Sequence, residues 1–187
     1  MNTVITSLES AFFHLISTSS FDLFLTLVLF GIVFHLKEYK NYLSLFLALS
    51  VGTIVGFLLA SLNITSFSYS TIKLGVAFAF IGVGIHNMIS NSPNANAVRY
   101  NFFALIGLIL GTNIELHYTK IFGSGFKFLS FSGYTLGAIV AFLLISFISC
   151  ILSSLLLMVF KTDRKSFNLA ISGIGVGIAI VLIYLRY

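Results

Sequence analysis

The chain of 187 residues contains very little charge, and this scarcity is its most informative feature. Only 8% of the residues are Asp, Glu, Lys or Arg, whereas 58% are hydrophobic, and the mean hydropathy is +1.08. The stretch from Phe128 to Phe160 contains no charged residue at all. A water-soluble fold needs a more polar exterior than this composition supplies, whereas about 20 consecutive apolar residues span a bilayer as a helix. The sequence therefore predicts an all-α, polytopic helical membrane protein.

Cysteine and catalytic motifs are also scarce. Cys150 is the only cysteine, which excludes an intramolecular disulfide and a cysteine metal cluster. The sequence has no His-Glu-x-x-His, no Gly-x-Ser-x-Gly and no phosphate-binding glycine loop. Gly123-Ser124-Gly125 lies between apolar runs without an evident base, so we interpret it as a turn. We therefore expect neither an enzyme nor a bound cofactor.

The net charge of +5 would suggest nucleic acid as a partner if the protein were soluble. Here the basic residues lie mostly in short connections between apolar runs, where they orient the chain and contact anionic lipid headgroups. We expect the lipid bilayer as the partner and no nucleic acid. Other membrane protein subunits are a second kind of partner that the sequence allows.

Apolar runs between charged or turn-rich breaks predict six transmembrane helices in a single domain over residues 1–187. They are expected at about Ser20–Leu36, Asn41–Ser61, Tyr69–Ile89, Asn101–Leu116, Ser130–Phe160 and Phe167–Tyr184. The fifth run is too long for one straight crossing. We expect Gly133 and Gly137 to break a short interfacial segment from its start, a tilted helix being the alternative. Residues Val4 to Ser17 are few for a complete crossing, so they predict a short N-terminal interfacial or re-entrant helix, a seventh span being the alternative.

The distribution of Lys and Arg predicts the orientation of these spans. The connections on one side contain Lys37, Lys40, Arg99, Lys161, Arg164 and Lys165. The other side receives Lys120, Lys127 and Arg186. Because short cytoplasmic loops are enriched in basic residues, both termini are expected outside. In a bacterial host this means a protein of the cytoplasmic (inner) membrane with periplasmic termini.

Four ionisable side chains form a candidate intramembrane polar cluster: His14, Asp22, Lys73 and Glu115. A charge near the bilayer centre is costly unless it is paired or hydrated, so each is a functional candidate by default. The topology allows Lys73 to pair with Asp22 or Glu115. Structural roles remain open, because Asp22 suits a helix N-terminus and Lys73 can extend to the headgroups. Glu115 and its neighbour His117 also suit an interfacial position.

Glycine pairs with Gly-x-x-x-Gly spacing occur in two of the predicted spans. They are Gly52 with Gly56 and Gly107 with Gly111. Small residues at this spacing let helix backbones approach closely in a membrane. The pairs therefore predict a compact bundle, without indicating a cargo.

Several short motifs follow one another in a fixed order along nearly the whole chain. They are His14, Asp22, Lys37-Glu38-Tyr39-Lys40, Gly52-Thr53, Ile72-Lys73, Asn87, Ile106-Gly107-Leu108-Ile109-Leu110-Gly111 and Leu136-Gly137-Ala138-Ile139. This order resembles the HupE/UreJ family, and more closely its short members common in Bacteroidota. Proteins of that family are associated with hydrogenase and urease and are viewed as nickel permeases. The resemblance implies a permease-like helical bundle.

Most polar site residues of that family are replaced in this chain. Leu23, Thr53 and Leu110 stand where the family has histidine, and Lys73 and Ile139 stand where it has glutamate. Nickel prefers imidazole and carboxylate ligands, of which only His14 and Asp22 remain. We therefore expect a degenerate metal site that holds no metal. We hypothesise that the Lys73 ammonium occupies the cation's place and neutralises Asp22; the alternative is that Lys73 points to the headgroups.

Two functions follow from this resemblance and its departures. The first is an accessory or assembly subunit of a larger membrane complex, built on a permease-derived scaffold. The loss of polar positions favours it, because a permease needs polar groups along its path. The alternative is a small-solute or metal-ion permease of the HupE/UreJ type, which the retained His14 and Asp22 keep open.

Overall fold

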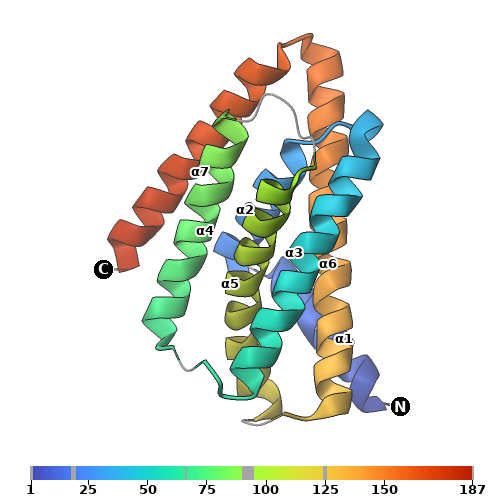
Figure 1. The fold of residues 1–187 in the computed structure, drawn as a ribbon, viewed down its shortest axis with the longest axis vertical. Helices are drawn as coiled ribbons and strands as arrows, with labels where there is room; N and C mark the ends of the chain where they lie inside the picture. Colours follow the sequence, from blue (N-terminus) through green and yellow to red (C-terminus); the bar gives the residue numbers. More distant parts are fainter. Residues whose placement is uncertain (1, 18–19, 66, 90–94, 124–125, 187) are drawn as a thin grey trace.

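The computed structural model describes residues 2–17, 20–65, 67–89, 95–123 and 126–186, and none of these residues is in a β-strand (Figure 1). The helices are α1 (Asn2–Ile16), α2 (Phe21–Ile32), the 3₁₀ turn η2 (Leu36–Glu38), α3 (Tyr39–Ser61), α4 (Tyr69–Ile89), α5 (Ala97–Phe122), α6 (Phe128–Phe160) and α7 (Arg164–Arg186). In this part of the chain, five helices, α3 to α7, are long and apolar enough to cross a membrane. The predicted all-α, multi-pass membrane class is confirmed, and the apolar helix faces contact the lipid bilayer.

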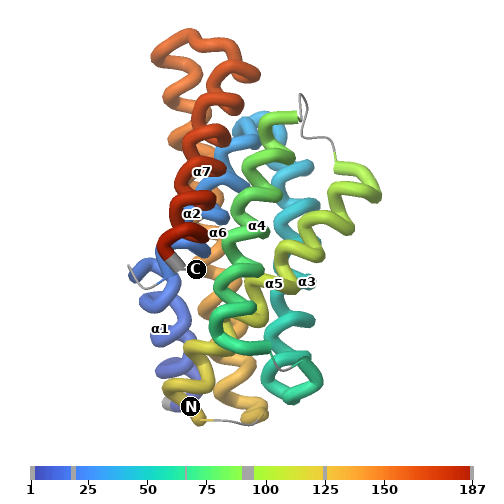
Figure 2. The backbone as a smooth tube through the Cα atoms, turned by 90° about the vertical axis from the view of Figure 1, so that its left-hand side faces the viewer, coloured from blue at the N-terminus to red at the C-terminus, as the bar shows by residue number. Residues whose placement is uncertain are grey.

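Helices α3 to α6 lie along the long axis of the bundle and alternate in direction, so α3 and α5 run parallel to each other (Figures 1 and 2). Helix α3 packs on α5, α1 packs on α6, α4 packs on α7, and the short α2 contacts α4, α6 and α7. The ends of α2, α4 and α6 and the starts of α3, α5 and α7 lie at the upper end in Figure 1, which we call the basic end because Lys37, Lys40 and Lys161 flank these helix ends. The start of α1, the ends of α3 and α5 and the starts of α4 and α6 lie at the opposite end.

The prediction of one continuous membrane-spanning helix over Ser20–Leu36 is wrong. Helix α2 ends at Ile32 and has 12 residues, which gives about 18 Å against a hydrocarbon core of about 30 Å. The predicted short N-terminal helix is present as α1, and the α1–α2 pair is bent by 80°. Figures 1 and 2 show α1 in the lower half of the bundle and α2 in the upper half. The described part of the chain thus has six crossings only when this bent pair is counted as one.

The predicted break at Gly133 and Gly137 is also wrong, because both glycines lie inside α6, a continuous helix of 33 residues. A Cβ atom at Gly133 would overlap the carbonyl oxygen of Val4, and one at Gly137 would overlap that of Leu8. These glycines therefore allow α1 to lie directly against α6. At 1.5 Å per residue α6 is about 50 Å long, so it exceeds the hydrocarbon core as the tilted alternative expected.

The two Gly-x-x-x-Gly pairs meet in one interface between α3 and α5. A Cβ atom at any of the four glycines would overlap a carbonyl oxygen of the facing helix. The facing pairs are Gly52 with Ala104, Gly56 with Leu108, Gly107 with Leu49, and Gly111 with Thr53. The two backbones are therefore in direct contact, which holds α5 in a defined register against α3.

Candidate functional site

A buried carboxylate lies in the first turn of α2, directly after the break from α1. Asp22 is 1% exposed, and its Oδ1 accepts a hydrogen bond of 3.0 Å from the backbone N–H of Leu23. A helix N-terminus favours a negative charge at this position. The Oδ2 atom lies 3.9 Å from Nζ of Lys73 on α4, whose side chain is 13% exposed. Of the two pairings that the topology allowed, the structure places Lys73 with Asp22.

Two histidines lie next to this ion pair. The His14 ring, near the end of α1, stacks on the His117 ring of α5, with 3.4 Å between ring centroids and 5° between the planes. His14 Nε2 forms a hydrogen bond of 2.9 Å with the Ser20 hydroxyl, and His117 Nδ1 forms one of 2.6 Å with the Tyr134 hydroxyl. The stacked pair thus connects the α1–α2 break to α5 and α6.

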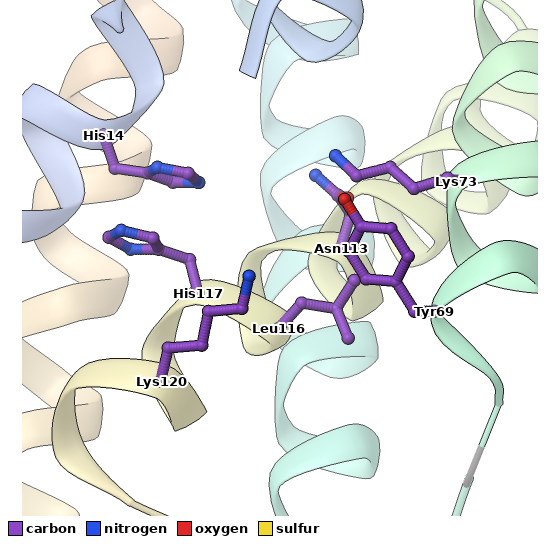
Figure 3. A pocket seen from close by; sticks show the side chains of 7 residues that line it. All are labelled: His14, Tyr69, Lys73, Asn113, Leu116, His117 and Lys120. Atoms are coloured by element: carbon purple, nitrogen blue, oxygen red, sulfur yellow. The ribbon is translucent and has the colours of Figure 1, made fainter. Parts of the chain in front are cut away.

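The histidines and Lys73 line a cavity of about 280 Å³ between α1, α4 and α5. The complete lining is His14, Tyr69, Lys73, Asn113, Leu116, His117 and Lys120. Figure 3 shows the two histidine rings on one side of this space and Lys73, Tyr69 and Asn113 on the other, with the Lys120 side chain between them. The Tyr69 ring lies near both ammonium groups, at 5.9 Å from Lys73 Nζ and 5.7 Å from Lys120 Nζ. We call this cavity the polar pocket.

Asn113 provides a buried polar group at the wall of the polar pocket. Its side chain is 3% exposed, and its Oδ1 has no hydrogen-bond partner among the residues that the structure describes. Leaving a buried acceptor unsatisfied costs roughly 1–3 kcal/mol, so native structures rarely do it without a reason. The oxygen is itself buried, so a molecule in the pocket does not reach it in this arrangement of the side chain.

The fourth member of the predicted cluster lies apart from the other three. Glu115 is absent from the pocket lining, and its Oε1 accepts a hydrogen bond from the Thr119 hydroxyl on the same helix. Sequence reasoning did not assign the three polar lining residues of α5 to the cluster; these are Asn113, His117, which was given an interfacial position, and Lys120. Their spacing of four and three residues places them on one helix face, so this polar stripe was the available signal.

The positions that differ from the HupE/UreJ pattern are outside the pocket lining, except for Lys73. Leu23 and Leu110 are completely buried, and the Thr53 hydroxyl donates to the Leu49 carbonyl of its own helix. Ile139 is half-buried against the core. In the described residues, no three side chains of His, Cys, Asp or Glu are grouped so that they can hold a metal ion. The chemistry of the pocket is therefore that of ammonium, imidazole, phenol and amide groups.

Comparisons with known proteins find no matching family model, no similar curated protein and no similar solved structure. The fold and the side chains of the polar pocket are therefore the features of this chain that indicate a function.

Proposed function

We propose that this chain is a permease-type protein of a bacterial cytoplasmic membrane, which binds a small polar solute in the polar pocket. The observation that carries this proposal is the coincidence of three features at one place. The pocket lies at the break between α1 and α2, beside the buried Asp22–Lys73 ion pair, and its wall includes the unsatisfied Asn113 amide. Transporters commonly bind their substrates where a membrane helix is interrupted, and ionisable groups inside a membrane commonly mark a substrate path.

The distribution of charge supports an outward-facing pocket. The basic end of the bundle corresponds to the cytoplasmic side under the positive-inside rule, which puts both termini in the periplasm. The pocket residues lie toward the other end, because Lys73 is in the second turn of α4 and Lys120 is in the last turn of α5. The solute would therefore enter from the periplasm.

A metal ion is not the solute that we propose. The resemblance to HupE/UreJ proteins supports a permease-derived scaffold, but Lys73 Nζ lies 3.9 Å from the carboxylate that would hold the cation. A fixed ammonium group next to Asp22 repels a divalent cation and already neutralises the carboxylate. The substitutions at Leu23, Thr53, Leu110 and Ile139 remove the remaining ligands of the family pattern.

Solute-dependent thermal stability tests this function. Cys150 is 2% exposed and is the only cysteine, so a fluorogenic maleimide reports unfolding of the detergent-purified protein without any labelling mutation. A ligand that binds only the folded state raises the unfolding temperature. We expect at least one class of small polar solute to do so in the wild type and to lose its effect in Lys120→Gln. The matched control is Lys40→Gln, an exposed lysine at the basic end. A protein that responds to no solute would contradict the proposal.

A second candidate function is the accessory subunit of a larger membrane complex. The last turn of α6 favours it, because Met158, Val159 and Phe160 are 70–74% exposed on a helix longer than the hydrocarbon core. A partner that covers this end would remove the apolar surface from water. Purification from the native host in mild detergent, followed by mass spectrometry, tests this function. Stoichiometric partner subunits would support it, whereas a protein that purifies alone would contradict it.

A further inference from the structure

The polar pocket contains more positive than negative charge. Lys73 and Lys120 both line it, and Figure 3 shows their side chains extending into the space between the histidine rings and Tyr69. The Asp22 carboxylate, 3.9 Å from Lys73 Nζ, balances the charge of that lysine. Among the described residues, Lys120 forms no ion pair within 4.0 Å. With neutral histidine rings the pocket therefore has an excess of one positive charge, which favours an anion.

The groups that line the pocket offer hydrogen-bond donors rather than acceptors to a bound molecule. An ammonium group has N–H donors and no acceptor. His14 Nε2 already bonds to the Ser20 hydroxyl, and His117 Nδ1 bonds to the Tyr134 hydroxyl. The Oδ1 atom of Asn113 is itself buried. A molecule whose surface accepts hydrogen bonds therefore fits this lining better than a molecule that has to donate them.

The charge and the size of the pocket limit the anion further. Lys120 is exposed near the end of α5, whereas the Lys73 side chain is only 13% exposed and lies beside Asp22. An anion held between the two lysines leaves part of its hydration shell, and this cost rises with its charge. The excess of one positive charge compensates a single negative charge. The cavity of about 280 Å³ also limits the ligand to a small molecule.

We infer that the polar pocket binds a small monovalent anion between Lys73 and Lys120, such as a short monocarboxylate or an inorganic anion of the same charge. This inference rests on the proposed function of the pocket and names the class of its solute. The ligands of this class share one negative charge and a surface of acceptor atoms. Recognition depends on the ammonium groups of α4 and α5 and requires no donor on the ligand.

Acetate and acetamide test the charge, because they have nearly the same shape and only acetate is charged. Nitrate supplies a single charge without carbon, malonate supplies a second carboxylate, choline is a cation and glycerol is a neutral polyol. Each is added to the detergent-purified full chain in a buffer whose only other anion is the bulky sulfonate HEPES. We expect acetate and nitrate to raise the unfolding temperature, and acetate to bind at least about tenfold more tightly than acetamide.

Substitutions of lysine connect the effect to the pocket. Lys120→Gln is expected to weaken acetate binding at least about threefold, because it removes a charged donor, and Lys120→Arg is expected to restore most of it. Lys40→Gln, the matched substitution at the basic end, is expected to leave the affinity unchanged. Salts also change protein stability without binding to a site. The comparison of Lys120→Gln with Lys40→Gln removes that general effect.

Asp22→Asn tests the charge balance in the opposite direction. This substitution removes the carboxylate that balances Lys73, so the excess of positive charge increases. We expect acetate to bind at least about threefold more tightly to this variant, and malonate to gain more than acetate. A purely structural role of Asp22 would not produce tighter binding. Unchanged or weaker acetate binding by the folded variant would overturn the charge balance on which the inference depends.

The remaining outcomes distinguish this inference from the function on which it rests. Stabilisation by acetamide, choline or glycerol but not by acetate or nitrate would overturn the anion while leaving a solute-binding pocket. Malonate binding more tightly than acetate to the wild type would overturn the restriction to a single charge. Phosphatidylglycerol has a monovalent phosphodiester, so stabilisation by this lipid and by none of the salts would overturn a free anion as the ligand. No stabilisation by any solute would overturn both the inference and the proposed function.

Discussion

The imidazole rings of His14 and His117 lie face to face, with 3.4 Å between their centroids and 5° between their planes. Protonation of both rings would place two positive charges at this distance, so the arrangement is compatible with at most one charged ring. The contact joins the end of α1 to the last turns of α5 and supports one wall of the polar pocket. His14 also forms a hydrogen bond with the Ser20 hydroxyl, just before α2. The stacked histidines therefore connect both α1 and the start of α2 to α5.

Removal of the His117 ring is expected to destabilise the protein. His117→Ala loses the stack with His14 and the hydrogen bond to Tyr134, and we expect a loss of about 1–3 kcal/mol in the free energy of unfolding. His117→Phe keeps a stacking ring and is expected to lose less. Thermal unfolding of His117→Phe, Tyr134→Phe and the double variant measures the hydrogen bond by itself. Fully additive effects would contradict a direct bond between the two side chains.

The Asp22–Lys73 pair is expected to respond asymmetrically to removal of each partner. Lys73→Met removes the cation beside the buried Asp22 carboxylate, and we expect a loss of roughly 3–5 kcal/mol. Asp22→Asn is expected to cost less, because the Lys73 ammonium lines the cavity and can be hydrated there. The double variant is expected to recover part of the loss. Unfolding curves that show Asp22→Asn to be the more destabilising change would contradict this account.

Close packing of α3 against α5 is expected to make Gly107 intolerant of any side chain. A Cβ atom there would overlap the Leu49 carbonyl oxygen, so Gly107→Ala forces the two backbones apart and is expected to cost about 1–3 kcal/mol. Gly177→Ala is the matched control, because nothing lies within 4 Å of its Cβ position. The control is expected to be neutral or slightly stabilising, since alanine favours helix over glycine. Equal unfolding temperatures for both variants would argue against the direct backbone contact.

At the basic end, Arg164 is expected to hold the start of α7 against the α2–α3 connection. Its guanidinium donates to Glu38 Oε1 at 2.8 Å, to Glu38 Oε2 at 2.7 Å and to the Val33 carbonyl at 2.6 Å. Arg164→Lys keeps the charge but loses this fork, so we expect faster amide hydrogen exchange in residues 33–38. Because both side chains are about a quarter exposed, the expected loss of stability is only about 1 kcal/mol or less. Unchanged exchange in this segment would contradict the anchoring role.

The resemblance to nickel permeases also yields a direct test. Lys73→Glu puts a second carboxylate beside Asp22 and His14, which creates the kind of ligand set that nickel prefers. We expect the variant to be destabilised without metal, because like charges then face each other, and to be stabilised by nickel. The wild type, with its ammonium at this position, is expected not to respond to nickel. Unchanged melting of the variant without metal would argue against the hypothesis that Lys73 takes the cation's place.

Composition and hydropathy alone determined the class of this protein and most of its spans. The predicted runs at Asn41–Ser61 and Tyr69–Ile89 agree closely with α3 and α4, because transfer of an apolar segment into lipid depends on that segment alone. The spacing of Asn113, His117 and Lys120 also places them on one helix face, although the sequence analysis did not group them. These properties are local, so the sequence contains them without reference to any other segment.

The end of α2, its bend from α1 and the contacts between helices depend on two segments of the chain at once, so only the tertiary structure decided them. The apolar run over Ser20–Leu36 does not indicate where α2 ends or how it bends from α1. Gly133 and Gly137 suggested a break, yet they serve close packing, and this distinction depends on the position of α1. Likewise, the stacking of His14 on His117 arises because α1 lies against the bundle near the end of α5. Such contacts are set by the packing of distant backbones, which hydropathy and periodicity along one helix do not encode.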